Sequence, residues 1–157
     1  MTLLEIKRFQ ELKENELKLI IDTHYNHWVK HNPKMVKEDT IEKFSKIYTK
    51  EELPFGIALL EDNHIVGFCV LKLECLKKYP EFSPWISDVM ILEPFRGKGY
   101  GKKLVSYGEQ ILKEYGYQTI YLWTDQAPEF YKKLGFQYRQ EVEKNEGGFG
   151  QLFSKNL

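Results

Sequence analysis

The segment Ile91-Leu92-Glu93-Pro94-Phe95-Arg96-Gly97-Lys98-Gly99-Tyr100-Gly101-Lys102-Lys103-Leu104 is the most informative stretch of this chain. It predicts a strand, a glycine-rich turn and the start of a helix. Glycine lets the backbone turn sharply and approach a ligand closely, and the first N–H groups of a helix have no partner within the helix. The helix dipole and four basic side chains add positive charge, so the segment predicts a site for a phosphate or pyrophosphate.

Spacing separates three kinds of phosphate-binding loop. A Walker A loop needs G-x-x-x-x-G-K-[ST], but the sixth position from Gly97 is Lys102 and no Ser or Thr follows to hold magnesium. A Rossmann loop needs G-x-G-x-x-G early in a βαβ unit, whereas these glycines give G-x-G-x-G past the middle of the chain. The third pattern, [RQ]-x-x-G-x-[GA], matches Arg96 to Gly101 at every fixed position. On these residues the segment resembles the acetyl-CoA loop of the GNAT superfamily of N-acetyltransferases.

A second motif supports the resemblance. The run Phe130-Tyr131-Lys132-Lys133-Leu134-Gly135-Phe136 is similar to the family's late Tyr-x-x-x-Gly-Phe element. The two motifs stand in the family's order and at its separation. The resemblance covers most of the chain, although its specific residues fall in the last half.

Length and composition indicate one globular domain, residues 1–157. The chain has 42% hydrophobic and 15% aromatic residues, and its 23 basic and 23 acidic residues balance. This balance favours neither nucleic acid nor a membrane as a partner. Met1 to Arg8 has no long apolar run and two cysteines are too few for a disulfide framework, so we expect a cytoplasmic protein with Cys69 as a core thiol.

Hydrophobic periodicity and turn residues predict the element order β-α-α-β-β-β-α-β-α-β-β. The first helix carries an apolar stripe from Leu17 to Trp28 and ends at Asn32-Pro33. The predicted strands are Leu3 to Phe9, Phe55 to Leu60, Ile65 to Leu73, Trp85 to Leu92, Tyr117 to Trp123, Gln137 to Val142 and Phe149 to Ser154. The other predicted helices are Lys37 to Lys50, Tyr100 to Tyr115 and Gln126 to Leu134. The resemblance implies the GNAT fold, of the α/β class (α+β by some schemes), with a mixed, twisted sheet of about seven strands and helices on both faces.

The resemblance also assigns a co-substrate, acetyl-CoA. It places the pantetheine and the acetyl carbonyl on the backbone of Val89, Met90 and Ile91, whose N–H groups would be preorganised donors. Core packing is the plain alternative for these side chains. The pyrophosphate would lie on the N–H groups of the loop, with Arg96 as a charge partner, and the residues concerned are Arg96, Gly97, Lys98, Gly99, Tyr100, Gly101 and Lys102.

Acetyl transfer to an amine also needs an acid and a base. Tyr131 occupies the position of the family's usual tyrosine, and its phenol could protonate the leaving thiolate or only pack against it. Many family members carry a glutamate early in the fourth strand, but here that position is Trp85. Glu81, or Asp88 if the strand bulges, are the leading candidates for the base, with Glu74, Glu93 or a water relay as alternatives.

Three further positions are open to two interpretations. Thr124 stands where the family often has an asparagine that contacts CoA, and it can also cap the short helix that follows. Trp85 is either a wall of the acceptor pocket, favouring amines by cation–π contact, or a core residue. Trp28 lies in the variable acceptor side of this fold together with His24, His27 and His31. His27 and His31 have the i, i+4 spacing of zinc ligands, but no third ligand accompanies them and no metal site is expected.

Two classes of function fit these observations. The favoured one is an acetyl-CoA-dependent N-acetyltransferase that acts by direct attack in a ternary complex, on a small-molecule primary amine or else on a protein N-terminus or lysine. The other is a non-catalytic acyl-CoA-binding sensor or regulatory module, for which Trp85 in the place of glutamate is the best support. Transfer of a longer acyl chain is a milder variant. The closing hairpin, Glu141 to Phe153, has an edge that could pair subunits, so a homodimer is possible.

Overall fold

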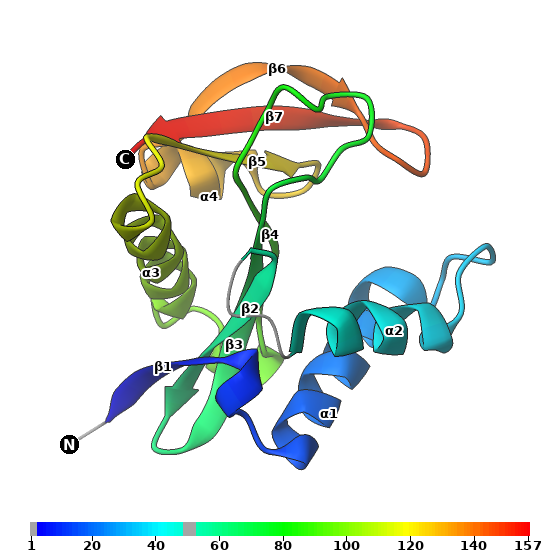
Figure 1. Cartoon of the computed structure of the whole chain (residues 1–157), viewed down its shortest axis with the longest axis vertical. Coiled ribbons are helices and arrows are strands. Elements are labelled where there is room, and N and C mark those ends of the chain that lie inside the picture. The colour runs from blue at the N-terminus through cyan, green and yellow to red at the C-terminus, as the bar shows by residue number, and fades with distance from the viewer. Residues whose placement is uncertain (1–2, 49–52) are drawn as a thin grey trace. The chain divides into compact units, whose positions relative to one another are not determined.

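The structure is a computed structural model that describes residues 3–48 and 53–157 (Figure 1). Its strands are β1 (Leu4–Arg8), β2 (Phe55–Glu61), β3 (His64–Lys72), β4 (Trp85–Ile91), β5 (Thr119–Thr124), β6 (Gln137–Glu143) and β7 (Phe149–Asn156). Its helices are α1 (Glu14–His24), α2 (Lys37–Tyr48), α3 (Tyr100–Glu114) and α4 (Pro128–Lys133), with a π-helical turn at Tyr25–Val29. The predicted element order is confirmed. Thr49 and Lys50, which the sequence places at the end of the second helix, lie outside the described residues.

The strands form one mixed sheet in the order β1-β2-β3-β4-β5-β7-β6. β4 and β5 are parallel, with Trp85 opposite Tyr121, whereas β1 with β2, β5 with β7 and β6 with β7 are antiparallel. The predicted mixed seven-stranded sheet with helices is therefore confirmed. Asp62 and Asn63 join β2 to β3 with φ angles of 49° and 67°, as a tight hairpin turn requires.

The chain forms two compact units. The first comprises Met1–Val70 and Asp88–Leu104, and the second comprises Leu71–Ser87 and Val105–Leu157. Strand β4 and helix α3 each contribute residues to both units. The assignment of residues 1–157 to a single domain stays a prediction.

Each unit has its own hydrophobic core. In the first unit, aromatic and aliphatic side chains of α1, α2, β2 and β3 pack with Met90 of β4, around the rings of Phe9, Phe44 and Phe68. In the second unit, Trp85 is fully buried with Leu76, Val142 and Leu152. In that unit α3 packs closely on the sheet residues Leu71 and Ile86, because Gly108 presents no side chain there.

The end of the first helix differs from the prediction. α1 stops at His24, and the π-helical turn that follows is closed by a hydrogen bond from the Lys30 N–H to the Tyr25 carbonyl, 2.8 Å. A π turn adds a residue and rotates the side chains that follow it. The predicted apolar stripe therefore holds at Ile20 and His24, which are buried, but fails at Trp28, whose side chain is 40% exposed.

Candidate active site

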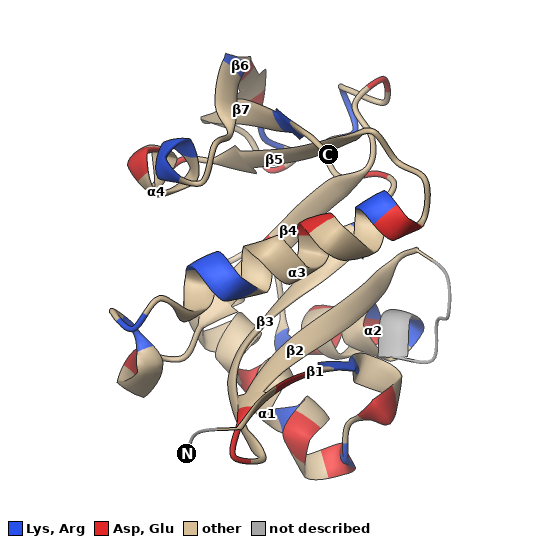
Figure 2. Ribbon diagram, turned by 90° about the vertical axis from the view of Figure 1, so that its left-hand side faces the viewer, with Lys and Arg blue, Asp and Glu red and all other residues tan. Residues whose placement is uncertain are grey.

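The glycine-rich loop has the conformation that its sequence predicts. Gly97 and Gly99 have φ angles of 79° and 83°, in the left-handed region that residues with a Cβ rarely adopt. The space that a Cβ would occupy at either position has no atom within 4 Å. Helix α3 begins immediately afterwards at Tyr100, and Figure 2 shows basic residues in its first turns. A helix start leaves its first N–H groups without partners inside the helix, and together with the adjoining positive charges this is what an anion site requires.

The side chain of Tyr100 anchors the start of the helix. Its hydroxyl donates a hydrogen bond to the carboxylate of Glu61 at the end of β2. That hydrogen bond is the main reason why the pKa of Tyr100 is raised. The side chain is thus engaged with the protein, and only the backbone of Tyr100 is available to a ligand.

The side chain of Arg96 makes two contacts with the end of β4. Its Nε–H donates to the carbonyl of Ile91 at 2.8 Å, and a guanidinium N–H lies 3.4 Å from the sulfur of Met90. The side chain therefore folds back onto β4 and braces the junction between strand and loop. It is exposed, so its remaining donors face solvent.

Strand β4 lies unusually close to β3 at the residues expected to hold the pantetheine. A Cβ on Gly67 would lie 2.7 Å from the Met90 carbonyl oxygen, so only glycine permits this approach. The N–H of Leu92 donates to the carbonyl of Val66 at 2.9 Å. Val89 and Ile91 are partly exposed, whereas Met90 is buried in the core of the first unit.

Asp88 interrupts the regular strand. Its φ of 55° is left-handed, a conformation that costs a non-glycine residue roughly 1–2 kcal/mol. Its carboxylate accepts a hydrogen bond from Lys43 Nζ at 2.6 Å and lies 3.3 Å from His24 Nε2. The sequence offers Asp88 as a base on condition that the strand bulges. The strand does depart from regular geometry there, but two basic partners occupy the carboxylate, which argues for a structural role.

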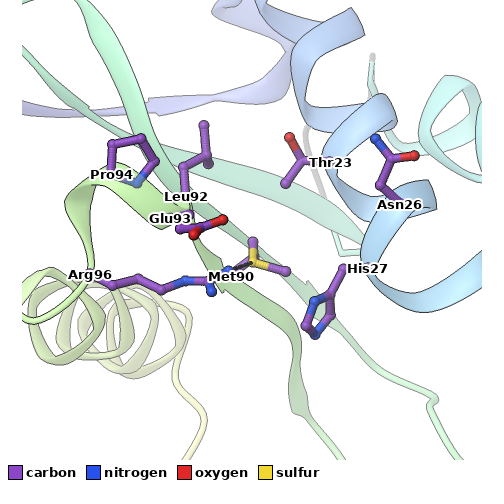
Figure 3. Close-up of a pocket in the computed structure, with 8 residues that line it drawn as sticks. All are labelled: Thr23, Asn26, His27, Met90, Leu92, Glu93, Pro94 and Arg96. Carbon is purple, nitrogen blue, oxygen red and sulfur yellow. Dashed lines mark hydrogen bonds between the residues drawn. The ribbon is translucent and has the colours of Figure 1, made fainter.

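A pocket of about 360 Å3 lies in the first unit between the end of α1 and the junction of β4 with the loop (Figure 3). Its lining is mainly polar, with a methionine and a leucine from β4 and the residue that follows it. The eight residues are Thr23, Asn26, His27, Met90, Leu92, Glu93, Pro94 and Arg96. In the close-up the Arg96 side chain extends along Met90 towards the side from which His27 projects.

His27 has a shifted protonation equilibrium in this pocket. Partial burial lowers its pKa from the usual 6.5, and the positive charge of Arg96 and the neighbouring His24 lower it further. These effects favour the neutral imidazole over the imidazolium. Its ring packs edge-on against Trp28, with centroids 4.7 Å apart, which restricts its orientation.

The remaining predicted site residues belong to the second unit. Tyr131, on α4, packs edge-on against Phe130 and Phe136, with ring centroids 5.0 and 5.9 Å away. Thr124 is buried, and its hydroxyl accepts the Ala127 N–H at 3.0 Å, so it stabilises the turn before α4. The N-cap of α4 itself is Ala127, which differs slightly from the predicted cap.

Trp85 and Glu81 also lie in the second unit. Trp85 has no exposed surface and its indole N–H donates to the Phe82 carbonyl at 2.6 Å, so the structure supports the core interpretation of this residue over the pocket wall. Glu81 is exposed in the loop before β4.

Sequence reasoning places His27 on the variable acceptor side of the fold but gives it no catalytic role. It does not mark Thr23 or Asn26, which line the same pocket. The sequence signal for these pocket residues is the cluster of polar residues where the helix ends. The π turn that sets their positions has no sequence pattern of its own. Within residues 3–48 and 53–157, no three His, Cys, Asp or Glu side chains gather as metal ligands would. None of the described helices is long and apolar enough to cross a membrane.

Comparison with known proteins agrees with the fold and the loop. Residues 17–136 match the Acetyltransferase (GNAT) family. The chain is 26% identical to N-alpha-acetyltransferase 30 of Schizosaccharomyces pombe over 121 residues, which cover 71% of this chain and 80% of that protein. It is 31% identical to the [Ribosomal protein bS18]-alanine N-acetyltransferase of Haemophilus influenzae over 93 residues, 57% of this chain and 59% of that one.

Solved structures show the same fold. An aminoglycoside 6'-N-acetyltransferase complexed with coenzyme A superposes with a TM-score of 0.76 at 18% identity, covering 97% of this chain and 96% of that one. PH1933 from Pyrococcus horikoshii superposes with a TM-score of 0.73 at 21% identity, over 99% of both chains.

The match to the family model defines the class of protein, an acyltransferase. The chain belongs to the Acetyltransferase (GNAT) family, and the prediction of an N-acetyltransferase is confirmed at that level.

Proposed function

We propose that this protein transfers the acetyl group of acetyl-CoA to a primary amine by direct attack within a ternary complex. The observation that carries the proposal is the loop from Arg96 to Lys102, with its two left-handed glycines at the start of α3. A pyrophosphate on these N–H groups would extend the pantetheine along Val89, Met90 and Ile91. Acetyl-CoA is the co-substrate, and no metal takes part in this scheme.

Direct attack is supported by the cysteines. Cys69 is fully buried, and burial together with the charge of Asp88 raises the pKa of its thiol, so this thiol is a poor nucleophile. Cys75 is partly exposed in the second unit. The buried Cys69 is thus unsuited to carry a covalent acetyl group, and two-substrate kinetics should give intersecting rather than parallel lines.

Tyr131 is the proposed acid for the leaving thiolate. Its phenol could deliver a proton to the sulfur when the tetrahedral intermediate collapses. We expect Tyr131→Phe to lower kcat while the affinity for CoA stays unchanged. A binding module would show no turnover in either form, so wild-type turnover separates the two classes of function.

The acceptor is proposed to be a small-molecule primary amine. The polar pocket and the exposed ring of Trp28, which could make a cation–π contact, would suit an amine. A protein N-terminus is the second candidate, because one relative described above is named an N-alpha-acetyltransferase and the other a ribosomal-protein alanine N-acetyltransferase.

A panel assay tests the proposal and discriminates between the acceptors. Thiol release from acetyl-CoA would be followed with polyamines, aminoglycosides, amino acid derivatives and peptides that have a free N-terminal alanine. Thiol release whose rate saturates with the concentration of a small amine supports the small-molecule acceptor. Thiol release only with the peptides would favour a protein N-terminus as the acceptor instead. CoA binding without thiol release for any amine would overturn the proposed acetyltransferase activity.

A further inference from the structure

We propose that the amine enters the pocket between α1 and the β4–loop junction, and that His27 accepts its proton. This inference rests on the proposed function and names a base for it. It adds a residue from the first helix to a reaction that sequence patterns place on β4, the loop and α4.

The reaction needs a proton acceptor because an alkylammonium has a pKa of about 10.4 and is not a nucleophile. The candidates from the sequence fit this task poorly. The carboxylate of Asp88 is paired with Lys43 and His24. Glu81 is an exposed carboxylate, as charged side chains at the surface usually are.

His27 lies where a base can act. It lines the pocket together with Met90, whose backbone belongs to the strand proposed for the pantetheine. It is exposed at the surface of the pocket, so an incoming amine can reach it, and contact with the Trp28 ring limits its rotation. Figure 3 shows His27 projecting from the helix side, with Glu93 and Arg96 coming from the strand side.

The charges around His27 suit a proton acceptor for a cation. The groups that face it are Glu93 and Arg96 across the pocket and His24 on its own helix. Arg96 and His24 favour the neutral imidazole, which is the form that accepts a proton. Glu93 supplies a negative charge that can hold the ammonium before it is deprotonated.

Bonds and protons balance in this scheme. Neutral His27 takes one proton from the ammonium, and the free amine attacks the thioester carbonyl, forming the N–C bond. Collapse of the tetrahedral intermediate breaks the C–S bond. The second nitrogen proton passes to solvent as the amide forms, while Tyr131 gives its phenol proton to the thiolate and regains one from solvent. The products are the amide, the free CoA thiol and an imidazolium that returns its proton to solvent.

The test is the pH dependence of kcat/KM for thiol release with the best amine, compared between wild type and His27→Gln. For the wild type we expect kcat/KM to fall as the pH drops through the His27 pKa, because the imidazolium cannot accept a proton. His27→Gln should lower kcat/KM at pH 7 about 100-fold, the low end of general-base effects, and should lose that acidic limb. Its CoA dissociation constant should match that of the wild type.

His64→Gln is the control, because His64 is exposed at the first position of β3 and is not among the residues that line the pocket. It should leave both rate and pH profile unchanged. If His27→Gln keeps the wild-type rate and acidic limb, the assignment of His27 is overturned while the acetyltransferase stands. If the wild type binds CoA but releases no thiol with any amine, the proposed function fails and the role of His27 with it.

Discussion

Gly97 and Gly99 shape the loop that we propose binds acetyl-CoA. Both have positive φ angles, and no atom lies within 4 Å of the point that a Cβ would occupy, so an added methyl group would strain the backbone without a clash. A non-glycine residue in this conformation costs roughly 1–2 kcal/mol. The loop of Gly99→Ala would therefore leave the binding conformation when empty, and we expect CoA affinity to fall about 5- to 30-fold, measured by titration calorimetry.

Gly147→Ala is the matched control for that variant. Gly147 has a φ of 96° in the hairpin between β6 and β7, and the space around its Cα is likewise open. The same strain should lower thermal stability without changing CoA affinity. Equal CoA affinity in Gly99→Ala and wild type would contradict the role of the loop.

Arg96 acts on the protonation of His27 from across the pocket. Its positive charge lowers the pKa of the imidazole. Removal of the charge in Arg96→Gln should raise that pKa, so the acidic limb of the kcat/KM profile should move to higher pH. A limb that stays in place or moves to lower pH would show that Arg96 does not act on the titrating group.

At the scale of single elements, β4 is held by contacts with two helices. Asp88 joins the strand to α1 through His24 and to α2 through Lys43. Asn tolerates a left-handed φ, so Asp88→Asn isolates the loss of charge from backbone strain. Because hydrogen bonds to charged groups contribute about 1.5–3 kcal/mol, we expect a loss of that order in the free energy of unfolding, measured with urea.

Two further variants separate the charge from the backbone at this position. Asp88→Gly relieves the φ strain but also loses both partners, and should be no more stable than Asp88→Asn. Lys43→Met should reproduce part of the loss. Wild-type stability in Asp88→Asn would show that the ion pair contributes nothing.

The close approach of β3 to β4 gives a second prediction at this scale. Gly67→Ala would place Cβ 2.7 Å from the Met90 carbonyl, so β4 must shift. We expect a lower melting temperature and weaker CoA binding. Gly108→Ala is the comparison, because its Cβ would meet only the side-chain ends of Ile86 at 3.0 Å and Leu71 at 3.3 Å. The substitution would also stabilise helix α3 by about 1 kcal/mol, since alanine has the higher helix propensity. Equal effects of the two variants would contradict the special position of Gly67.

At the scale of the whole molecule, sequence reasoning predicted the element order, the mixed sheet and the loop. It succeeded there because glycine spacing and hydrophobic periodicity are local signals. It could not predict that the side chain of Trp28 is exposed, because the π turn that contains Trp28 depends on how the end of the helix packs. It allowed for a bulge at Asp88 but not for the partners of its carboxylate, because His24 and Lys43 approach from 64 and 45 residues away.

The arrangement of the sheet also bears on oligomeric state. β6 is the last strand of the sheet and exposes Tyr138 by 51%, and Phe149 at the start of β7 is 62% exposed. An exposed edge strand of this kind can pair with a second copy. Gel filtration with light scattering is expected to give a dimer mass, and Tyr138→Glu should shift it towards the monomer. A monomer mass for the wild type at all concentrations would remove the homodimer.

The measurement that tests the central claim most directly is thiol release from acetyl-CoA with one primary amine and with its N,N-dimethyl counterpart. Both carry a positive charge and can enter the same pocket, but only the primary amine can lose two protons and form a stable amide. We predict release that depends on the primary amine and is absent with the dimethyl compound. Equal release with both, or none with either while CoA still binds, would contradict acetyl transfer to a primary amine.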